Sequence, residues 1–193
     1  MKTKNKMINH FEIQKTVIKD LLILQRKPLG DSRGYLERLF CQQELEPILN
    51  GKTISQVNHT LTATIGTVRG IHFQYPPCAE TKFVSCIHGE VFDVAVDLRK
   101  GSSTFLQYHA EILSANNYKT MFIPEGFAHG FQTLSQNCEM LYFHTAEYDS
   151  DSEGALNVAD PCLNIEWPLK ITDISKRDLN HPLVTNDFMG ISI

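Results

Sequence analysis

Short stretches in which apolar and polar residues alternate recur along this chain, and each ends at Gly, Pro, Asn or Ser. The clearest stretch is residues 89–98, which is rich in valine and includes a phenylalanine. β-Branched and aromatic residues at a period of two are typical of strands. The polar alternates Asp93 and Asp97 fit a strand with one face toward the interior of a barrel. This pattern predicts an all-β protein, an antiparallel sandwich or barrel.

The same pattern predicts further strands and few helices. A weak helix is expected over residues 42–49, and a short C-terminal helix is expected to begin at Ser175, whose hydroxyl would be its N-cap. The expected strands cover residues 17–24, 35–40, 55–61, 68–74, 82–87, 105–113, 120–123, 131–134 and 139–145, with another near Ile165.

Size and charge limit the class of protein. With 193 residues, 42% of them hydrophobic, the chain suits one domain over residues 1–193, with a core at about 17–170 and a C-terminal helical segment at about 171–193. A formal net charge of −4 without a basic stripe makes nucleic acid or a membrane surface an unexpected partner.

No run approaches the roughly 20 apolar residues of a membrane helix. Five irregularly spaced cysteines indicate reduced thiols. A soluble, cytoplasmic protein is expected.

Two segments carry residues suited to proton chemistry. The first contains His72, followed by Lys82 in an apolar strand, and the second is a Pro-x-Gly-x-x-His turn that ends at His129. The turn looks like the second half of a cupin signature. Metal-binding cupins place two histidines two residues apart in the first half, where this chain has His72 and Gln74. An amide replaces an imidazole poorly as a ligand, so no metal is predicted. A site of His72, Glu80 and His129 remains the metal-dependent alternative.

Ten collinear segments resemble the dTDP-4-dehydrorhamnose 3,5-epimerase family. They extend from about Leu22 to Asp178, which is most of the chain. They are residues 31–35, 56–59, 68–74, Lys82, 89–97, 123–131, 141–142, 152–154, 165–168 and 174–178. The resemblance implies a cupin-like double-stranded β-helix, or jelly-roll barrel, with N-terminal strands and short C-terminal helices. It also implies a homodimer whose strands exchange at the interface.

The resemblance further implies a cofactor-free isomerase in deoxysugar biosynthesis, for a surface polysaccharide or a glycosylated product. The family's substrate is a nucleotide-diphospho-4-keto-6-deoxyhexose, whose carbons 3 and 5 are inverted through an enolate. His72 matches the family's base, and an imidazole suits proton abstraction at neutral pH. Asp178 matches the carboxylate that orients it. Lys82 matches the cation facing the oxyanion, and Tyr142 matches the acid on the opposite face.

The resemblance to the family also implies residues that bind the substrate. Guanidinium groups pair well with phosphate, amide edges suit a base or sugar hydroxyl, and tyrosines can stack on the base. The candidates are Arg33, Arg69 and Arg177, or Lys176, for the diphosphate, Gln56 and Asn58 for polar contacts, Tyr35 and Tyr148 for stacking, and His129, Glu153 and Arg38 as further pocket residues.

The chain departs from the family pattern at three places. Arg38 stands where thymidine-specific members carry a glutamate, Val57 stands where they carry an aspartate, and an aromatic residue is missing near residues 157–160. These changes leave the proton chemistry intact but leave open a GDP- or CDP-linked ketosugar or a heptose, and inversion at a single carbon. Two other classes also stay open: a metal-dependent cupin isomerase or dioxygenase, and a non-catalytic sugar-nucleotide binding protein.

Overall fold

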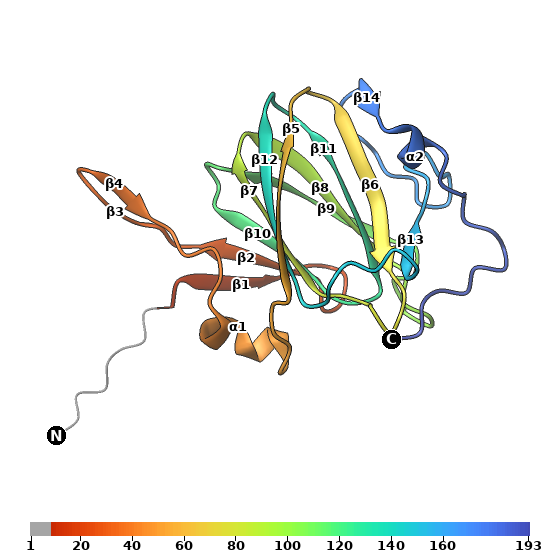
Figure 1. The fold of residues 1–193 in the computed structure, drawn as a ribbon, viewed down its shortest axis with the longest axis horizontal. Coiled ribbons are helices and arrows are strands. Elements are labelled where there is room, and N and C mark those ends of the chain that lie inside the picture. Colours follow the sequence, from red (N-terminus) through yellow and green to blue (C-terminus); the bar gives the residue numbers. More distant parts are fainter. Residues whose placement is uncertain (1–8) are drawn as a thin grey trace.

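The computed structural model describes residues 9–193, and two sheets packed face to face form its body (Figure 1). The first sheet has the order β1 (Phe11–Lys15), β2 (Leu22–Arg26), β10 (Lys119–Ile123), β7 (Lys82–His88), β12 (Cys138–His144) and β5 (Gln56–Thr62). The second has the order β13 (Glu153–Ala155), β6 (Thr67–Gln74), β11 (Phe127–Thr133), β8 (Glu90–Asp97) and β9 (Tyr108–Ser114). Strands far apart in sequence are thus neighbours, as in a jelly roll.

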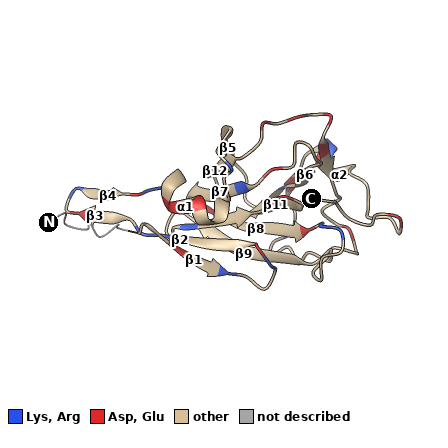
Figure 2. Ribbon diagram, turned by 90° about the horizontal axis from the view of Figure 1, so that it is seen from below, with Lys and Arg blue, Asp and Glu red and all other residues tan. Residues whose placement is uncertain are grey.

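The remaining elements lie around this sandwich. A hairpin of β3 (Leu29–Asp31) and β4 (Gly34–Leu36) projects away from it in both ribbon views (Figures 1 and 2). Helix α1 (Gln42–Leu49) packs Leu45 and Leu49 against the outer side of the first sheet. Strand β14 (Asp173–Ile174) pairs in parallel with β6, and helix α2 (Lys176–Leu179) follows it.

The C-terminal third of the chain buries the outer face of the second sheet. Val91 and Ala95 of β8 point between the sheets, whereas Val94 and Val96 point outward and pack against residues such as Leu156, Val158 and Leu163. Both faces of β8 are therefore buried, whereas the alternation predicts one interior face. Asp93 and Asp97 are fully buried as well.

Most of the expected strands are confirmed, but β4 ends at Leu36 rather than at residue 40, β9 begins at Tyr108 rather than at residue 105, and larger errors occur toward the two ends of the chain. Residues 17–20 form the turn between β1 and β2, where Val17 is 86% exposed and Asp20 has a φ of 71°. No strand occurs at Ile165, which packs against the core from a loop, and the unexpected β13 and β14 border β6 instead. Helix α1 is confirmed, and so is the Ser175 N-cap, whose hydroxyl accepts from the Asp178 N–H at 3.0 Å.

The distribution of charged residues along the described part of the chain agrees with the expectation from the sequence. Basic and acidic residues are interspersed along the ribbon, without a one-sign stripe (Figure 2). Within residues 9–193, no helix has the length and apolar character needed to cross a membrane.

Candidate active site

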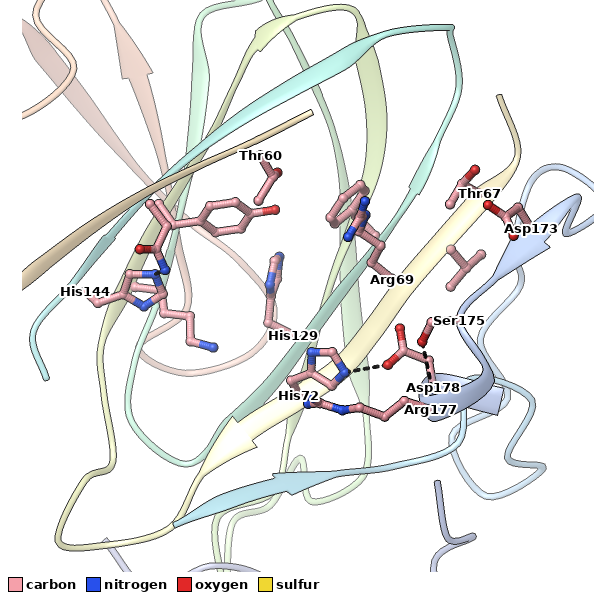
Figure 3. A pocket seen from close by; sticks show the side chains of 15 residues that line it. Thr60, Thr67, Arg69, His72, His129, His144, Asp173, Ser175, Arg177 and Asp178 are labelled. Atoms are coloured by element: carbon pink, nitrogen blue, oxygen red, sulfur yellow. Dashed lines mark hydrogen bonds and ion pairs between the residues drawn. The ribbon is translucent and has the colours of Figure 1, made fainter. Parts of the chain in front are cut away.

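His72 and His129 lie directly opposite each other on the neighbouring strands β6 and β11. The two strands approach closely at Gly70 and Gly130, where a Cβ on Gly70 would lie 2.6 Å from the Cα of Gly130. The His129 Nε2 is 2.8 Å from Oδ1 of the fully buried Asp93, and burial raises the pKa of that carboxyl. The second sheet thus presents two imidazoles to one cavity, one of them oriented by a buried acid (Figure 3).

Asp178 reaches His72 from a distant part of the chain. The Ser175 cap begins α2 so that Asp178 Oδ1 lies 2.9 Å from His72 Nε2, while Oδ2 accepts from the Gly70 N–H at 3.3 Å. Burial lowers the pKa of His72, partly offset by its hydrogen bond to Asp178. Burial alone would raise the pKa of Asp178, but the hydrogen bond and charge of His72 hold it below its ordinary value. At neutral pH this favours a neutral imidazole beside a carboxylate.

The first sheet forms the opposite wall with strands β7, β12 and β5. Tyr142 pairs with Asn58 in register, and His144 pairs with Lys82. The Lys82 ammonium is 3.0 Å from Glu80 and its side chain is 11% exposed. Burial raises the pKa of Tyr142 well above its ordinary value, so its hydroxyl keeps its proton at neutral pH. This wall therefore offers a neutral acid and a cation.

The two walls enclose a cavity of about 490 Å³, a size typical of sites for small molecules. It brings together eight of the residues expected from sequence: His72, Lys82, Tyr142, Asp178, Asn58, Arg69, His129 and Arg177. An adjoining cavity of about 450 Å³ shares His72, Lys82 and Arg177 with it and adds Gln56, Tyr148 and Glu153. The Tyr148 hydroxyl donates to Glu153 at 2.9 Å, and Glu153 also pairs with Arg177.

Three expected residues, and Lys176 as the alternative to Arg177, lie outside both cavities within one chain. Arg33 and Tyr35 are on the projecting β3–β4 hairpin, where the Arg33 side chain is 87% exposed and paired with Asp31. Arg38 lies beside α1, where its guanidinium contacts Glu44 at 2.5 Å. These side chains do not border the cavity of their own chain, so they could contact a ligand only in a cavity of another molecule.

Several residues of the site have no role assigned from the sequence. His144 lies two residues after Tyr142 on β12, so strand alternation places both on one face and could have indicated it. Asp93 is expected from the sequence to lie on β8, but its contact with His129 is not. His181 lies 3.3 Å from Asp178 and follows it by three residues. Glu80 is expected from the sequence only as a metal ligand, and it contacts Lys82 and His144 instead.

The alternative set of His72, Glu80 and His129 is not assembled as a metal site. Among the described residues, the His, Cys, Asp and Glu side chains close enough to share an ion are His72, Asp178 and His181. Two of these already form the histidine–carboxylate pair described above, which gives them a role without an ion.

Comparisons with known proteins bear on the family and the fold of this chain. The family model for dTDP-4-dehydrorhamnose 3,5-epimerase matches residues 15–186. The dTDP-4-dehydrorhamnose 3,5-epimerase of Salmonella typhimurium is 45% identical over 172 residues, which are 88% of this chain and 93% of that protein. The structure of dTDP-6-deoxy-D-glucose-3,5-epimerase RmlC from Legionella pneumophila, in complex with dTDP-4-keto-L-rhamnose, aligns with a TM-score of 0.88 at 36% identity, covering 95% of this chain and all (100%) of that one.

A second solved structure gives the same result. The dTDP-4-dehydrorhamnose 3,5-epimerase from Bacillus anthracis, with TDP and PPi bound, aligns with a TM-score of 0.86 at 35% identity and covers 90% of this chain and 99% of that one. The cupin-like jelly roll predicted from the sequence is thereby confirmed, and so is the family resemblance.

Proposed function

The chain belongs to the dTDP-4-dehydrorhamnose 3,5-epimerase family, and from this premise we propose that it inverts carbons 3 and 5 of a dTDP-linked 4-keto-6-deoxyhexose in deoxysugar biosynthesis. It is an isomerase. The observation that supports this function best is the opposition of the two walls. His72 with Asp178 on the side of the second sheet faces Tyr142 and Lys82 of the first sheet across one cavity, so a sugar ring between them meets a base on one side and an acid on the other.

His72 is the proposed base. Its Nε2–H donates to Asp178, which leaves Nδ1 as the nitrogen with a free lone pair. The ketone at carbon 4 acidifies the neighbouring C–H bonds, and when Nδ1 removes such a proton, the electron pair moves to the ketone oxygen as an enolate. Asp178 then stabilises the imidazolium that has formed.

Lys82 and Tyr142 complete the proposed reaction from the other wall. The buried ammonium of Lys82 faces the negative charge that develops on the enolate oxygen, where a preorganised cation is most effective. The Tyr142 hydroxyl returns a proton to the opposite face of the carbon, which inverts it. Proton exchange with solvent restores His72 and Tyr142 for the second carbon. Side chains and exchange with solvent supply every proton in this scheme, so we propose no cofactor.

Substrate binding extends from this centre toward the adjoining cavity. We assign the diphosphate to Arg69 and Arg177, whose side chains border the cavity. Gln56, Asn58, His129, Tyr148 and Glu153 are proposed to contact the sugar and nucleotide. Arg33 and Tyr35 of the hairpin, and Arg38 after it, join them only if a second copy of the chain brings this segment to the site, so we propose a homodimer with exchanged strands. The cytoplasmic location also stays a proposal, compatible with five free cysteines.

Deuterium incorporation tests the function directly. In deuterated water, dTDP-4-keto-6-deoxyglucose should acquire deuterium at carbons 3 and 5, as measured by NMR and mass spectrometry. GDP- and CDP-linked ketosugars serve as parallel substrates, and labelling at one carbon alone would identify a single-carbon epimerase. Absence of deuterium uptake with all of these substrates would refute the proposed activity and leave a binding protein.

Two substitutions separate the roles of the two walls. His72→Asn should abolish exchange at both carbons, whereas Tyr142→Phe should retain exchange through His72 but lose inversion. His88→Asn is the matched control, because His88 is exposed at the far end of β7 and outside both cavities. Equal loss of exchange and inversion in Tyr142→Phe would remove Tyr142 from the role of opposite-face acid.

A further inference from the structure

Glu80 is a buried carboxylate that the proposed mechanism leaves without a role. Its Oε1 lies 3.0 Å from the Lys82 ammonium, and its Oε2 lies 2.6 Å from Nδ1 of His144. The side chains of Glu80 and His144 are 8% and 11% exposed. Burial would raise the pKa of Glu80, but the bonds from His144 and Lys82 hold it below its ordinary value. Glu80 is thus an anion shared between the proposed oxyanion cation and an imidazole.

His144 in turn contacts the side-chain amides of the cavity wall. Its Nε2 lies 3.4 Å from Nδ2 of Asn58, and Oδ1 of Asn58 accepts from Nε2 of Gln56 at 3.1 Å. Oε1 of Gln56 in turn accepts from the backbone N–H of Tyr148 at 3.0 Å. A continuous series of hydrogen bonds therefore joins Lys82 to the segment that carries Tyr148.

The direction of every bond in this series is fixed by its two ends. The backbone N–H of Tyr148 can only donate, so the Gln56 oxygen faces it and the Gln56 NH₂ faces Asn58. The Asn58 NH₂ then faces His144, whose Nε2 has to accept. Consequently Nδ1 of His144 carries the proton and donates it to the Glu80 carboxylate. Each donor in the series meets an acceptor, from the buried Glu80 and His144 side chains out to the more exposed Asn58 and Gln56.

We propose that Glu80 and His144 are a positioning pair, which holds the Lys82 ammonium and the Asn58 and Gln56 amides in one fixed arrangement. This inference rests on the proposed function, because it assigns the oxyanion contact to Lys82 and the substrate contacts to the amides. The pair thereby aligns the Lys82 ammonium, which faces the enolate oxygen, with the Asn58 and Gln56 amides, which contact the rest of the substrate. The ring of His144 also stacks at 6.0 Å on Tyr142, so the same pair supports the acid.

Stability alone is a weak explanation for these charges. Burying the Glu80–Lys82 ion pair costs about as much desolvation energy as its attraction returns, and apolar residues of the same size often stabilise a fold as well or better. Glu80 and His144 also line the cavities, with His144 bordering both and Glu80 the second. Its place at the site favours a role in orienting groups that meet the substrate.

The decisive variant is Glu80→Gln, which keeps the shape of the side chain and replaces one acceptor oxygen with an NH₂ donor. The amide can accept from only one of Lys82 and His144. If its NH₂ faces Nδ1, His144 switches to the Nε2–H tautomer and opposes the Asn58 NH₂. Either the His144–Asn58 bond is then lost, or both amides turn over and Gln56 loses its bond from the Tyr148 N–H. We expect kcat to fall by about 100-fold, as for a small misplacement of a catalytic group, and KM to rise as well, because the Asn58 and Gln56 amides lose their alignment.

Variants at His144 distinguish positioning from packing. His144→Gln can accept from Asn58 through its oxygen and donate to Glu80 through its nitrogen, so we expect it to retain most activity. His144→Leu fills the space without either bond and should resemble Glu80→Gln. In the double variant Glu80→Gln/His144→Leu the losses should not add, since both changes break one unit. Additive losses, or a His144→Gln variant as impaired as His144→Leu, would overturn the proposal.

A matched control is available on the same strands. His59 of β5 pairs with Glu139 of β12 at 2.9 Å, but both side chains are at least one-third exposed and lie outside the cavities. Glu139→Gln should therefore leave kcat and KM unchanged. Loss of activity in Glu139→Gln equal to that in Glu80→Gln would show that any histidine–glutamate pair here acts through the sheet, against the proposal.

A measurement without turnover keeps this inference separate from the proposed activity. In ¹⁵N-histidine-labelled protein, the His144 ring should be in the Nδ1–H tautomer, and Glu80→Gln should convert it to Nε2–H and weaken dTDP binding in calorimetry. The Nε2–H tautomer in the unmodified protein would overturn the positioning pair even if the protein is an active epimerase. Conversely, an inactive protein with the Nδ1–H tautomer and Glu80-dependent dTDP binding would refute the activity and support the pair.

Discussion

His72 should control the acid side of the pH profile. Its pKa is lowered from 6.5, first by burial, and the hydrogen bond and charge of Asp178 oppose that shift. A base with a lowered pKa is neutral and active above that value, and it loses activity as the pH falls through it. We therefore expect kcat/KM to be constant near neutrality and to decrease only at a pH lower than 6.5. The decrease should follow the pH dependence of a single protonation.

Asp178 provides the check on this assignment. Because Asp178 raises the pKa of His72, Asp178→Asn should move the acid limb to lower pH while reducing the maximal rate. The rate falls because the neutral amide stabilises the imidazolium less than the carboxylate does. An acid limb that stays in place in Asp178→Asn would mean that another group controls it.

Residue identities in the site were predictable where a local motif carries them. His72, Lys82 and His129 lie in recognisable segments, and Asp178 was found through the segment that contains Ser175, although 106 positions separate it from His72. The Glu80–His144 pair was not found. Its bonds depend on the register of β5, β7 and β12, which brings residues from three strands together. A sequence pattern shows which face a side chain takes, but not which partner it meets there.

At the scale of elements, the strands of the sandwich could be predicted because their apolar runs and turn residues are local signals. The burial of β8 on both faces could not, because it depends on the segment that contains Leu156, Val158 and Leu163. That segment has little regular structure and thus no periodic signal. Its path over the second sheet also places β14 and α2 beside β6, which brings Asp178 to His72.

The close approach of β6 and β11 should be sensitive to a single methyl group. A Cβ on Gly130 would lie 2.8 Å from the carbonyl oxygen of Arg69 and 3.2 Å from the Cα of Gly70, so Gly130→Ala has to separate the two strands. We expect a loss of about 1–3 kcal/mol in the free energy of unfolding. Activity should fall too, because the same strands carry His72 and His129. Thermal unfolding and kcat measure the two effects.

Gly51 supplies the control for that substitution. It follows α1 with a φ of 82°, and a methyl group on its Cα would have no other atom within 4 Å, so Gly51→Ala carries a backbone cost without a clash. It should lower the melting temperature and leave kcat unchanged. If Gly130→Ala lowers the melting temperature but retains full activity, the strand contact does not position the two histidines.

At the scale of the whole molecule, the chain has a formed cavity and a hairpin that does not reach it. Leu29, Tyr35 and Leu36 on the hairpin are more than half exposed, and so are Val57 and Leu61 on the outer face of the edge strand β5. Exposed apolar groups of this kind are typical of surfaces that another chain covers. The sequence indicated Arg33 and Tyr35 as binding residues, and their distance from the cavity is the physical reason to propose that they serve the site of a second copy.

Mixed dimers test whether the hairpin completes the partner's site. His72→Asn and Arg33→Ala should each impair both sites of their own homodimer. In a mixed dimer with exchanged hairpins, one site receives both substitutions and the other receives neither, so coexpression should restore activity per mixed dimer to about half that of the unmodified protein. Differently tagged chains purified in tandem, with mass measured by light scattering, provide the sample. If Arg33 instead acts within its own chain, each site carries one of the two substitutions. The activity of the mixed dimer is then no higher than that of the Arg33→Ala protein.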